Sequence, residues 1–317
     1  MTENLYDLAI IGGGPGGLTL AMYARRKELK VVIFEGKQFG GYMLTTPIIQ
    51  NYPGFAEVTG EELSRLMAEQ ALSYKPDVIM EEVVKIHQND DKTFHIATSL
   101  GKEVETKTIA FATGSAYKTL GAPGEKEYTG KGVSYCATCD APLFKNKTVA
   151  VIGGGNTALT SALLLSDIAT KVYLIHRRED FKGEEFLVEQ IKAKGKTEFL
   201  FNSSLVQIKG EKFVKTITVR DVKNPTQTKD LLVDGVFVHV GVAPLTTLAT
   251  QLGIELNQQG FIKLGEKLET NVPGVFALGD VTGKHLQIVQ ATADGALVAG
   301  SVFEYLTGKK SGADYKH

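Results

Sequence analysis

The sequence is poor in cysteine, in net charge and in long apolar stretches, and each shortage excludes a class of protein. Cys136 and Cys139 are the only cysteines among 317 residues, and no second cysteine or histidine pair exists to complete the four ligands of a structural zinc site. The formal net charge of −1 gives no electrostatic basis for binding nucleic acid or an anionic membrane. No apolar run approaches the roughly 18 residues of a membrane-spanning helix. We therefore expect a globular protein with no metal, nucleic-acid partner or membrane, and, because residues 1–7 are polar and short, no secretory signal.

The two cysteines belong to one motif, Cys136-Ala-Thr-Cys139, which Asp140 follows. Two residues between cysteines keep the sulfurs close enough for a disulfide, and the thiolate formed on reduction can attack the disulfide of a partner. In a chain without a secretory signal, such a pair is typical of a reducing compartment, where permanent disulfides are rare. The motif predicts a catalytic dithiol in a cytoplasmic protein.

The N-terminal segment has the pattern of a dinucleotide-binding unit. A strand, a helix and a second strand are expected at 5–11, 18–28 and 31–34. Between the first strand and the helix, Gly12 permits a tight turn, Gly14 lets the backbone approach a pyrophosphate, and Gly17 lets helix and strand pack closely. Glu35 ends the second strand, where a carboxylate can accept hydrogen bonds from both hydroxyls of a ribose. This arrangement favours the adenosine ribose of FAD.

A second motif of the same kind follows the dithiol. A strand at 149–152, a helix at 159–166 and a strand at 171–175 are expected, with Gly153, Gly155 and Ala158 in the places of the three glycines. Counting from Gly153 the number of positions that separates Gly12 from Glu35 leads to His176, the first residue of the sequence His176-Arg177-Arg178. Guanidinium groups bind a 2′-phosphate, which a carboxylate would repel, so this motif favours NADPH. The alternative for both arginines is a solvated end of a strand.

A third feature lies near the C-terminus, where an apolar strand ends in Gly279-Asp280. An aspartate at the carboxyl end of such a strand can hold the ribityl or phosphate groups of a flavin. It can instead cap the helix that follows, which we expect at 285–306. Two dinucleotide sites and a dithiol together predict an electron path from NADPH through FAD to sulfur.

These motifs, in this order and spacing, closely resemble those of the low-molecular-weight thioredoxin reductases, and the resemblance covers essentially the whole chain. It rests on the two glycine motifs, Ala112-Thr113-Gly114, Cys136-Ala-Thr-Cys139-Asp140, His176-Arg177-Arg178 and Gly279-Asp280. It implies an α/β fold of two Rossmann-like, three-layer ββα domains, the second inserted in the first. A discontinuous FAD domain would span 1–116 and 244–317, and an NADPH domain carrying the dithiol would span 117–243.

The resemblance also implies roles for individual residues. Cys139 would be the sulfur nearest the flavin, Cys136 the outer thiol that attacks thioredoxin, and Asp140 the acid that protonates the leaving thiolate. The implied FAD residues are Gly12, Gly14, Pro15, Gly17, Glu35, Gly41, Asn51, Thr113, Gly114, Gly279, Asp280, Gln287 and Ile288. The implied NADPH residues are Gly153, Gly155, Asn156, Thr157, Ala158, His176, Arg177, Arg178 and Lys182. The implied partners are thioredoxin or a thioredoxin-like protein and a second copy of the chain in a homodimer.

Three positions depart from the family pattern. Tyr42 stands where a glutamine that contacts the flavin is usual, and Leu286 stands where an arginine usually precedes Gln287. Lys182 replaces the third arginine of the phosphate-binding cluster. Because an ammonium is a point charge without the planar fork of a guanidinium, we expect weaker binding of the phosphate.

Two other functions are compatible with the residues. The same flavin and dithiol can serve another electron donor, such as NADH, ferredoxin or a deazaflavin, or another dithiol acceptor. A flavin-bound redox sensor whose dithiol regulates a partner without turnover is the third possibility. His87, His95 and His239 are isolated in the sequence, which favours packing or surface positions over ligand binding.

Overall fold

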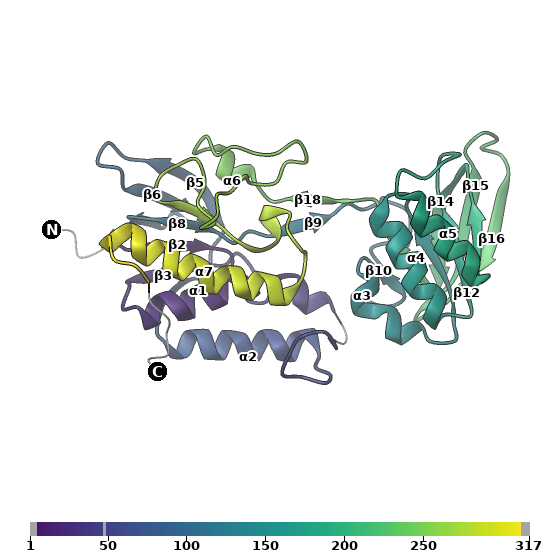
Figure 1. The fold of residues 1–317 in the computed structure, drawn as a ribbon, viewed down its shortest axis with the longest axis horizontal. Coiled ribbons are helices and arrows are strands. Elements are labelled where there is room, and N and C mark those ends of the chain that lie inside the picture. Colours follow the sequence, from purple (N-terminus) through teal and green to yellow (C-terminus); the bar gives the residue numbers. More distant parts are fainter. Residues whose placement is uncertain (1–4, 47–48, 312–317) are drawn as a thin grey trace. The chain divides into compact units, whose positions relative to one another are not determined.

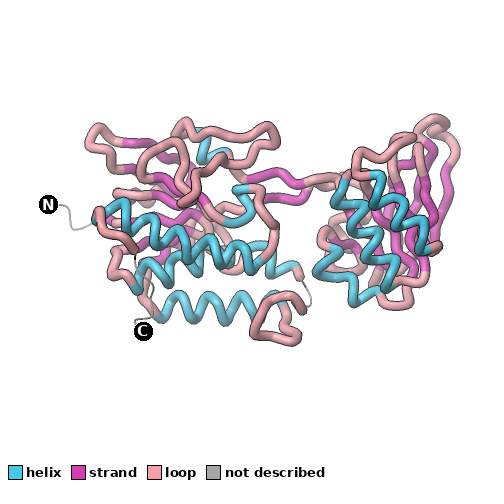
Figure 2. The backbone as a smooth tube through the Cα atoms, in the orientation of Figure 1, coloured by secondary structure: helices cyan, strands magenta, loops and turns pink. Residues whose placement is uncertain are grey.

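A computed structural model describes residues 5–46 and 49–311, which form a mixed α/β fold with parallel sheets. The chain divides into two compact units. The first comprises Met1–Thr45, Tyr52–Ala116 and Ala243–His317, and the second comprises Thr46–Asn51 and Tyr117–Val242. Figure 2 shows helices and strands in both units. The second unit therefore interrupts the first in the sequence.

The first unit is built on the parallel sheet of order β19-β8-β2-β3-β4 and a smaller sheet of order β1-β7-β6-β5. Its strands are β1 (Leu5–Tyr6), β2 (Leu8–Ile11), β3 (Val31–Phe34), β4 (Asp77–Ile79), β5 (Val83–Gln88), β6 (Phe94–Thr98), β7 (Glu103–Thr106), β8 (Ile109–Phe111) and β19 (Val275–Ala277). Its α-helices are α1 (Pro15–Arg26), α2 (Gly60–Ser73), α6 (Thr247–Thr250) and α7 (Ile288–Thr307). Its 3-10 helices are η1 (Gly41–Thr45) and η3 (Gly279–Thr282).

The parallel sheet of this unit is covered on both faces, which explains why its strands are continuous apolar runs. Ile11 and Phe34 pack with the smaller sheet in one buried cluster. Leu8 and Ile10 pack with α1 and α7 in another. Figure 1 shows α1, α2 and α7 together on that second face. The result is the three-layer ββα arrangement, with the carboxyl ends of the strands left for a ligand.

The second unit repeats this architecture. Its strands are β10 (Val133–Ser134), β11 (Thr148–Ile152), β12 (Lys171–Ile175), β13 (Thr197–Leu200), β14 (Ser203–Gly210), β15 (Val214–Asp221), β16 (Thr228–Leu232) and β17 (Gly235–Val238). Its helices are α3 (Ala137–Asp140), η2 (Ala141–Phe144), α4 (Asn156–Ile168) and α5 (Glu185–Lys194). The parallel sheet has the order β10-β17-β11-β12-β13, and a separate antiparallel sheet has the order β14-β15-β16. One cluster joins the parallel sheet to the helices, and another joins it to the antiparallel sheet.

Two connections between the units, at Ala116–Tyr117 and at Val242–Ala243, lie within strands. β9 (Ser115–Tyr117) and β18 (Val242–Pro244) pair with each other as a two-stranded sheet. Backbone hydrogen bonds extend this pairing at both ends, from Lys118 N to Gly241 O at 2.9 Å and from Leu245 N to Gly114 O at 3.1 Å. These two connections are therefore held together as one two-stranded ribbon.

Local structure differs from the expected elements at two places. The expected strand at 5–11 is divided at Asp7, so that β1 pairs with β7 and β2 with β3 and β8. The Asp7 carboxylate accepts a hydrogen bond from Lys30 N at 2.9 Å and pairs with Lys107 Nζ at 2.8 Å. Asp7 thus marks the point at which the chain passes from one sheet to the other.

The expected closing helix at 285–306 begins only at Ile288, as α7.

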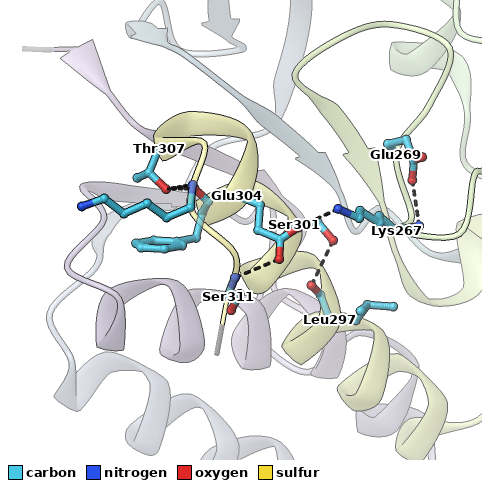
Figure 3. Close-up of polar contacts among 9 residues, drawn as sticks. Lys267, Glu269, Leu297, Ser301, Glu304, Thr307 and Ser311 are labelled. Atoms are coloured by element: carbon cyan, nitrogen blue, oxygen red, sulfur yellow. Dashed lines mark hydrogen bonds and ion pairs between the residues drawn. The ribbon is translucent and has the colours of Figure 1, made fainter. Parts of the chain in front are cut away.

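The C-terminal end of α7 is fixed by polar contacts around Glu304 (Figure 3). Its carboxylate pairs with Lys267 Nζ at 2.6 Å and accepts a hydrogen bond from Ser311 N at 2.8 Å. These contacts lower the pKa of Glu304, mainly through the hydrogen bond from Lys267. They tie the C-terminal end of α7 to the loop that precedes β19 within the first unit.

Among residues 5–46 and 49–311, no helix has the length and apolar character needed to cross a membrane.

Candidate functional site

The predicted FAD residues of the first unit gather at one edge because parallel strands end on the same side of a sheet. Gly12 follows β2, Glu35 follows β3, Thr113 and Gly114 follow β8, and Gly279 follows β19. These strands are neighbours in the sheet, and α1 starts at this edge with Pro15 as its first residue. Four separate sequence segments therefore converge on the place where open α/β sheets bind ligands.

The three motif glycines of this unit play different geometric roles. Gly12 has a φ of 110°, and a Cβ there would overlap the carbonyl oxygen of Ala112. A Cβ on Gly17 would overlap the carbonyl oxygen of Gly12. A Cβ on Gly14, by contrast, would meet no described atom within 4 Å. Gly12 and Gly17 are required by the fold itself, whereas Gly14 leaves open space at the N-terminus of α1, as a bound pyrophosphate needs.

Glu35 is held in place before any ligand binds. Its Oε2 accepts a hydrogen bond from Gly13 N at 2.9 Å, and its Oε1 accepts one from Lys37 N at 2.9 Å. Each carboxylate oxygen has a further lone pair, so the side chain can still receive ribose hydroxyls. The geometry fits the predicted role at the adenosine ribose.

Asp280 lies at the same edge in an environment that favours its protonated form. Burial raises the pKa of its carboxyl to about 6, while a hydrogen bond with Ser115 lowers it and the nearby charge of Asp294 raises it. The buried Asp294 accepts a hydrogen bond from Gly279 N at 3.1 Å. The N-cap of α7 is Gln287, so Asp280 does not cap that helix. A partly buried carboxyl of this kind can donate a hydrogen bond to a flavin phosphate or accept one from a ribityl hydroxyl.

The remaining predicted FAD residues are not all at this edge. A Cβ on Gly41 would lie 3.6 Å from the Cα of Gly14, so these two glycines adjoin. Gln287 and Ile288 begin α7, and Ala291 N donates to Gln287 O at 3.1 Å. Asn51 lies in the segment Thr46–Asn51, which groups with the second unit.

The turn of the second motif has the same design. Gly153 has a φ of 153°, and a Cβ there would overlap the carbonyl oxygen of His239. Gly155 is again open, with no described atom within 4 Å of a Cβ. The buried Ala158 packs against Gly153, and Thr157 follows Asn156 in the first turn of α4. The amide of Asn156 is anchored by two hydrogen bonds with Glu184, at 2.8 and 3.0 Å.

A hollow beside this turn, the basic cavity, is lined by three basic and two acidic residues. A cavity of about 480 Å³ is lined by Arg178, Glu179, Asp180, Phe181, Lys182, Asn202 and Lys223. Lys182 is fixed against the turn by a hydrogen bond from its N to Gly154 O at 2.7 Å. Glu179 forms an ion pair with Lys223, which no sequence motif singled out. Arg177, Arg178 and Lys182 are all exposed, but only Arg178 and Lys182 line the cavity, so these two are the better placed of the predicted phosphate ligands.

His176 takes the position that Glu35 has in the first unit. Its ring is buried against Gly154, where a Cβ would overlap it, and its Nε2 has no hydrogen-bond partner among the described residues. Burial lowers the pKa of His176, and the charges of Arg178, Arg177 and Lys182 add to that effect. A neutral imidazole with a buried, unpaired nitrogen is suited to a ligand that supplies the missing hydrogen bond.

The open glycines allow a reciprocal test of the two sites. Gly14→Ala adds one methyl to open space at little cost to the fold, so we expect folded protein whose FAD affinity falls by at least about tenfold, because the methyl occupies the path of the pyrophosphate. Gly155→Ala should keep FAD and lose NADP⁺ affinity to a similar extent. Flavin content after gel filtration and NADP⁺ titration measure the two losses. Loss of both ligands from either variant would contradict separate sites.

The dithiol lies at the start of α3. Cys136 and Cys139 are joined as a disulfide with their Cα atoms 5.3 Å apart. Cys136 is the N-cap of α3, and its Sγ accepts a hydrogen bond from Cys139 N at 3.2 Å. Both side chains are partly exposed. A backbone N–H directed at Cys136 Sγ will stabilise a thiolate there after reduction, which is a requirement for attack on a partner disulfide.

Asp140 provides a buried carboxyl next to the dithiol. Its Oδ2 accepts a hydrogen bond from Ser134 Oγ at 2.6 Å, and its Oδ1 is buried with no partner among the described residues. Burial raises the pKa of Asp140, and the hydrogen bond from Ser134 acts in the opposite direction. Ser134 Oγ also accepts from Cys136 N at 3.1 Å. Ser134, which the sequence did not single out, thus links the carboxyl of Asp140 to the backbone of Cys136.

Comparison with known proteins agrees with this combination of sites. Residues 6–295 match the family described as pyridine nucleotide-disulphide oxidoreductase. Thioredoxin reductases of Treponema pallidum and Bacillus subtilis are 38% and 37% identical to the chain over 306 residues. The matched region covers 96% of this chain, 98% of the Treponema pallidum protein and 96% of the Bacillus subtilis protein. The crystal structure of thioredoxin reductase from Streptococcus pyogenes is 37% identical and has a TM-score of 0.88, with 97% of this chain and 100% of that one covered.

Proposed function

Because the chain belongs to the pyridine nucleotide-disulphide oxidoreductase family, we propose that it is a flavoprotein that uses NADPH to reduce thioredoxin or a thioredoxin-like protein. The observation that carries this proposal is the Cys136–Cys139 disulfide beside Asp140, in the unit that also holds the second glycine motif. A dithiol, a proton donor and a nucleotide turn on one compact unit are the parts that such a reductase requires.

The two units divide the cofactors between them in this proposal. The range 1–116 with 244–317 holds FAD through the edge formed by Gly12, Gly14, Glu35 and Asp280. The range 117–243 holds NADPH through the turn at Gly153–Gly155 and the basic cavity. Bound FAD supplies the chemistry that turns a two-electron hydride donor into a reductant for a disulfide.

The residues of the second unit then carry out the thiol chemistry. Reduction of the Cys136–Cys139 disulfide consumes two electrons and two protons and leaves two thiols. The Cys136 thiolate attacks the partner disulfide and forms a mixed disulfide, releasing one partner thiol. Cys139 then attacks Cys136, which restores the internal disulfide and releases the second partner thiol. Asp140, whose pKa is raised by burial, supplies the proton that a departing thiolate requires.

The proposal places the nicotinamide site and the dithiol in the same unit, which requires that unit to move during turnover. Hydride entry and disulfide reduction each need the reacting atoms at about 3 to 3.5 Å from one flavin ring. The nicotinamide site and the dithiol must therefore approach the ring in turn. We propose that the second unit rotates as a body about the β9–β18 ribbon to exchange them.

Choice of nucleotide depends on the basic cavity. Loss of one charge-assisted contact costs about 1.5 to 3 kcal/mol, or roughly tenfold to over a hundredfold in affinity. Arg178→Ala is therefore expected to raise the Michaelis constant for NADPH by that factor and to change the constant for NADH little. Arg177→Ala, at a position that does not line the cavity, serves as the matched comparison and should have the smaller effect. Equal use of NADH and NADPH by the unaltered enzyme would contradict a phosphate site here.

The assembly and location follow from the proposed chemistry. We propose a homodimer, as the family resemblance implies, and a cytoplasmic enzyme, because a dithiol that must be reduced in every cycle belongs in a reducing compartment. Sedimentation of the FAD-bound protein measures the first directly.

One assay separates the proposed function from its alternatives. The purified protein should contain about one FAD per chain, as one flavin motif implies, and should oxidise NADPH continuously when oxidised thioredoxin is present. Stoichiometric oxidation that stops after one equivalent would indicate a redox sensor. Turnover with an artificial donor but not with NADPH would indicate another electron source, and turnover with only one of several small dithiol proteins would name the acceptor.

A further inference from the structure

One polar atom near the second glycine motif has no role in the function described above. Nε2 of His239 is buried and has no hydrogen-bond partner among the described residues. The other buried side-chain atoms in that condition are His95 Nδ1, Asp140 Oδ1 and His176 Nε2. Two of these, on Asp140 and His176, belong to the proposed catalytic and NADPH sites. Since an unpaired buried nitrogen costs free energy, a ligand that supplies its partner is the natural explanation.

The sheet order places His239 beside the nucleotide turn. His239 follows β17, which lies between β11, the strand that leads into the glycine turn, and β10, the strand that leads into the dithiol helix. Its N donates a hydrogen bond to Ile152 O at 2.8 Å. Its carbonyl oxygen occupies the position that a Cβ on Gly153 would need. The backbone of His239 therefore forms one wall of the turn that receives the pyrophosphate.

His239 and His176 occupy matching positions on opposite sides of this turn. His176 follows β12 and packs its ring on Gly154, whereas His239 follows β17 and places its carbonyl oxygen against Gly153. The adenosine half of the dinucleotide belongs on the β12 side, where Arg178 and Lys182 line the cavity. A dinucleotide that crosses the end of β11 must then place its other half on the β17 side.

We propose that the His239 side chain hydrogen-bonds the nicotinamide half of NADP(H), at the nicotinamide ribose or the carboxamide, as the counterpart of His176 on the adenosine half. This inference rests on the NADPH site proposed above. Burial lowers the pKa of His239 to about 4, so the imidazole is neutral near pH 7. A neutral ring can donate or accept a hydrogen bond without repelling the positive charge of the oxidised nicotinamide.

Ligands that carry one or both halves of the dinucleotide test this assignment directly. The FAD-bound full-length enzyme would be titrated with NADP⁺ and with adenosine 2′,5′-bisphosphate, which lacks the nicotinamide half. His239→Ala should weaken NADP⁺ by about threefold to tenfold, the effect of one neutral hydrogen bond, and leave the bisphosphate unchanged. His239→Gln, which keeps a polar group of similar reach, should restore part of the loss.

His176→Ala is the matched control, because it removes the equivalent imidazole from the adenosine side and should weaken both ligands. Equal weakening of both ligands by His239→Ala would show that His239 only supports the turn, and no change in either would remove it from the site. A slower reaction of the dithiol with unaltered NADP⁺ binding would assign His239 to the sulfurs instead. If the unaltered enzyme binds neither ligand, the NADPH site itself is wrong, which is a different failure.

Discussion

Replacement of Cys139 by serine is expected to abolish thioredoxin reduction, by at least about a thousandfold, while NADPH still reduces the bound flavin. The serine hydroxyl cannot form the internal disulfide, so the electrons that reach the flavin have no route to the partner. Cys136→Ser should lose turnover equally, because it removes the thiol that attacks the partner. Anaerobic bleaching of the flavin by NADPH and steady-state NADPH oxidation with thioredoxin measure the two halves of the reaction separately.

One of the two residues between the cysteines provides a control for this result. Thr138 is exposed and lies in the same turn of α3, so Thr138→Ala disturbs the helix to a similar degree but leaves both sulfurs in place. Its turnover should stay within about twofold of the unaltered enzyme, as is usual for surface changes. Direct electron transfer from the flavin to a small quinone should persist in all three variants. Normal thioredoxin turnover by Cys139→Ser would exclude the dithiol from the mechanism.

The large elements of the fold could be read from the sequence because their signals are local. A continuous apolar strand, a glycine turn and an amphipathic helix lie within about 30 residues of one another in each nucleotide-binding motif. The structure has β2, α1 and β3 in the first unit and β11, α4 and β12 in the second, in these places. Element boundaries were less accurate, and α1 starts at Pro15, three residues before the expected helix.

Features that depend on contacts between distant segments could not be predicted. Asp7, where the chain changes sheet, pairs with the distant Lys107, and the carboxyl of Asp294 reaches Gly279 only because α7 returns to the edge of the sheet. His239 looked isolated in the sequence, and the sheet order that places β17 beside β11 is what brings it to Gly153. The chemistry-bearing motifs were visible, whereas the residues that support them were not.

In the proposed mechanism, a departing thiolate takes its proton from Asp140. Because burial raises the pKa of this carboxyl, more of it is protonated near neutral pH than of an exposed aspartate. Thioredoxin reduction should therefore decline as pH rises through the pKa of Asp140, since the acid form is lost. Asp140→Asn cannot supply a proton, so we expect turnover to fall by about a hundredfold or more and that alkaline decline to disappear. Reduction of the flavin by NADPH should be unaffected.

Ser134→Ala separates the proton donor from its support. The hydrogen bond from Ser134 favours the ionised form of Asp140, so its removal should raise the pKa of Asp140 further and move the alkaline decline to higher pH. The acid is retained, and the loss of turnover should be much smaller than in Asp140→Asn. The pH profiles of the two variants and the unaltered enzyme, measured with the same thioredoxin, compare these effects. An alkaline decline that persists unchanged in Asp140→Asn would assign the proton to another group, and one that moves to lower pH in Ser134→Ala would reverse the role inferred for this serine.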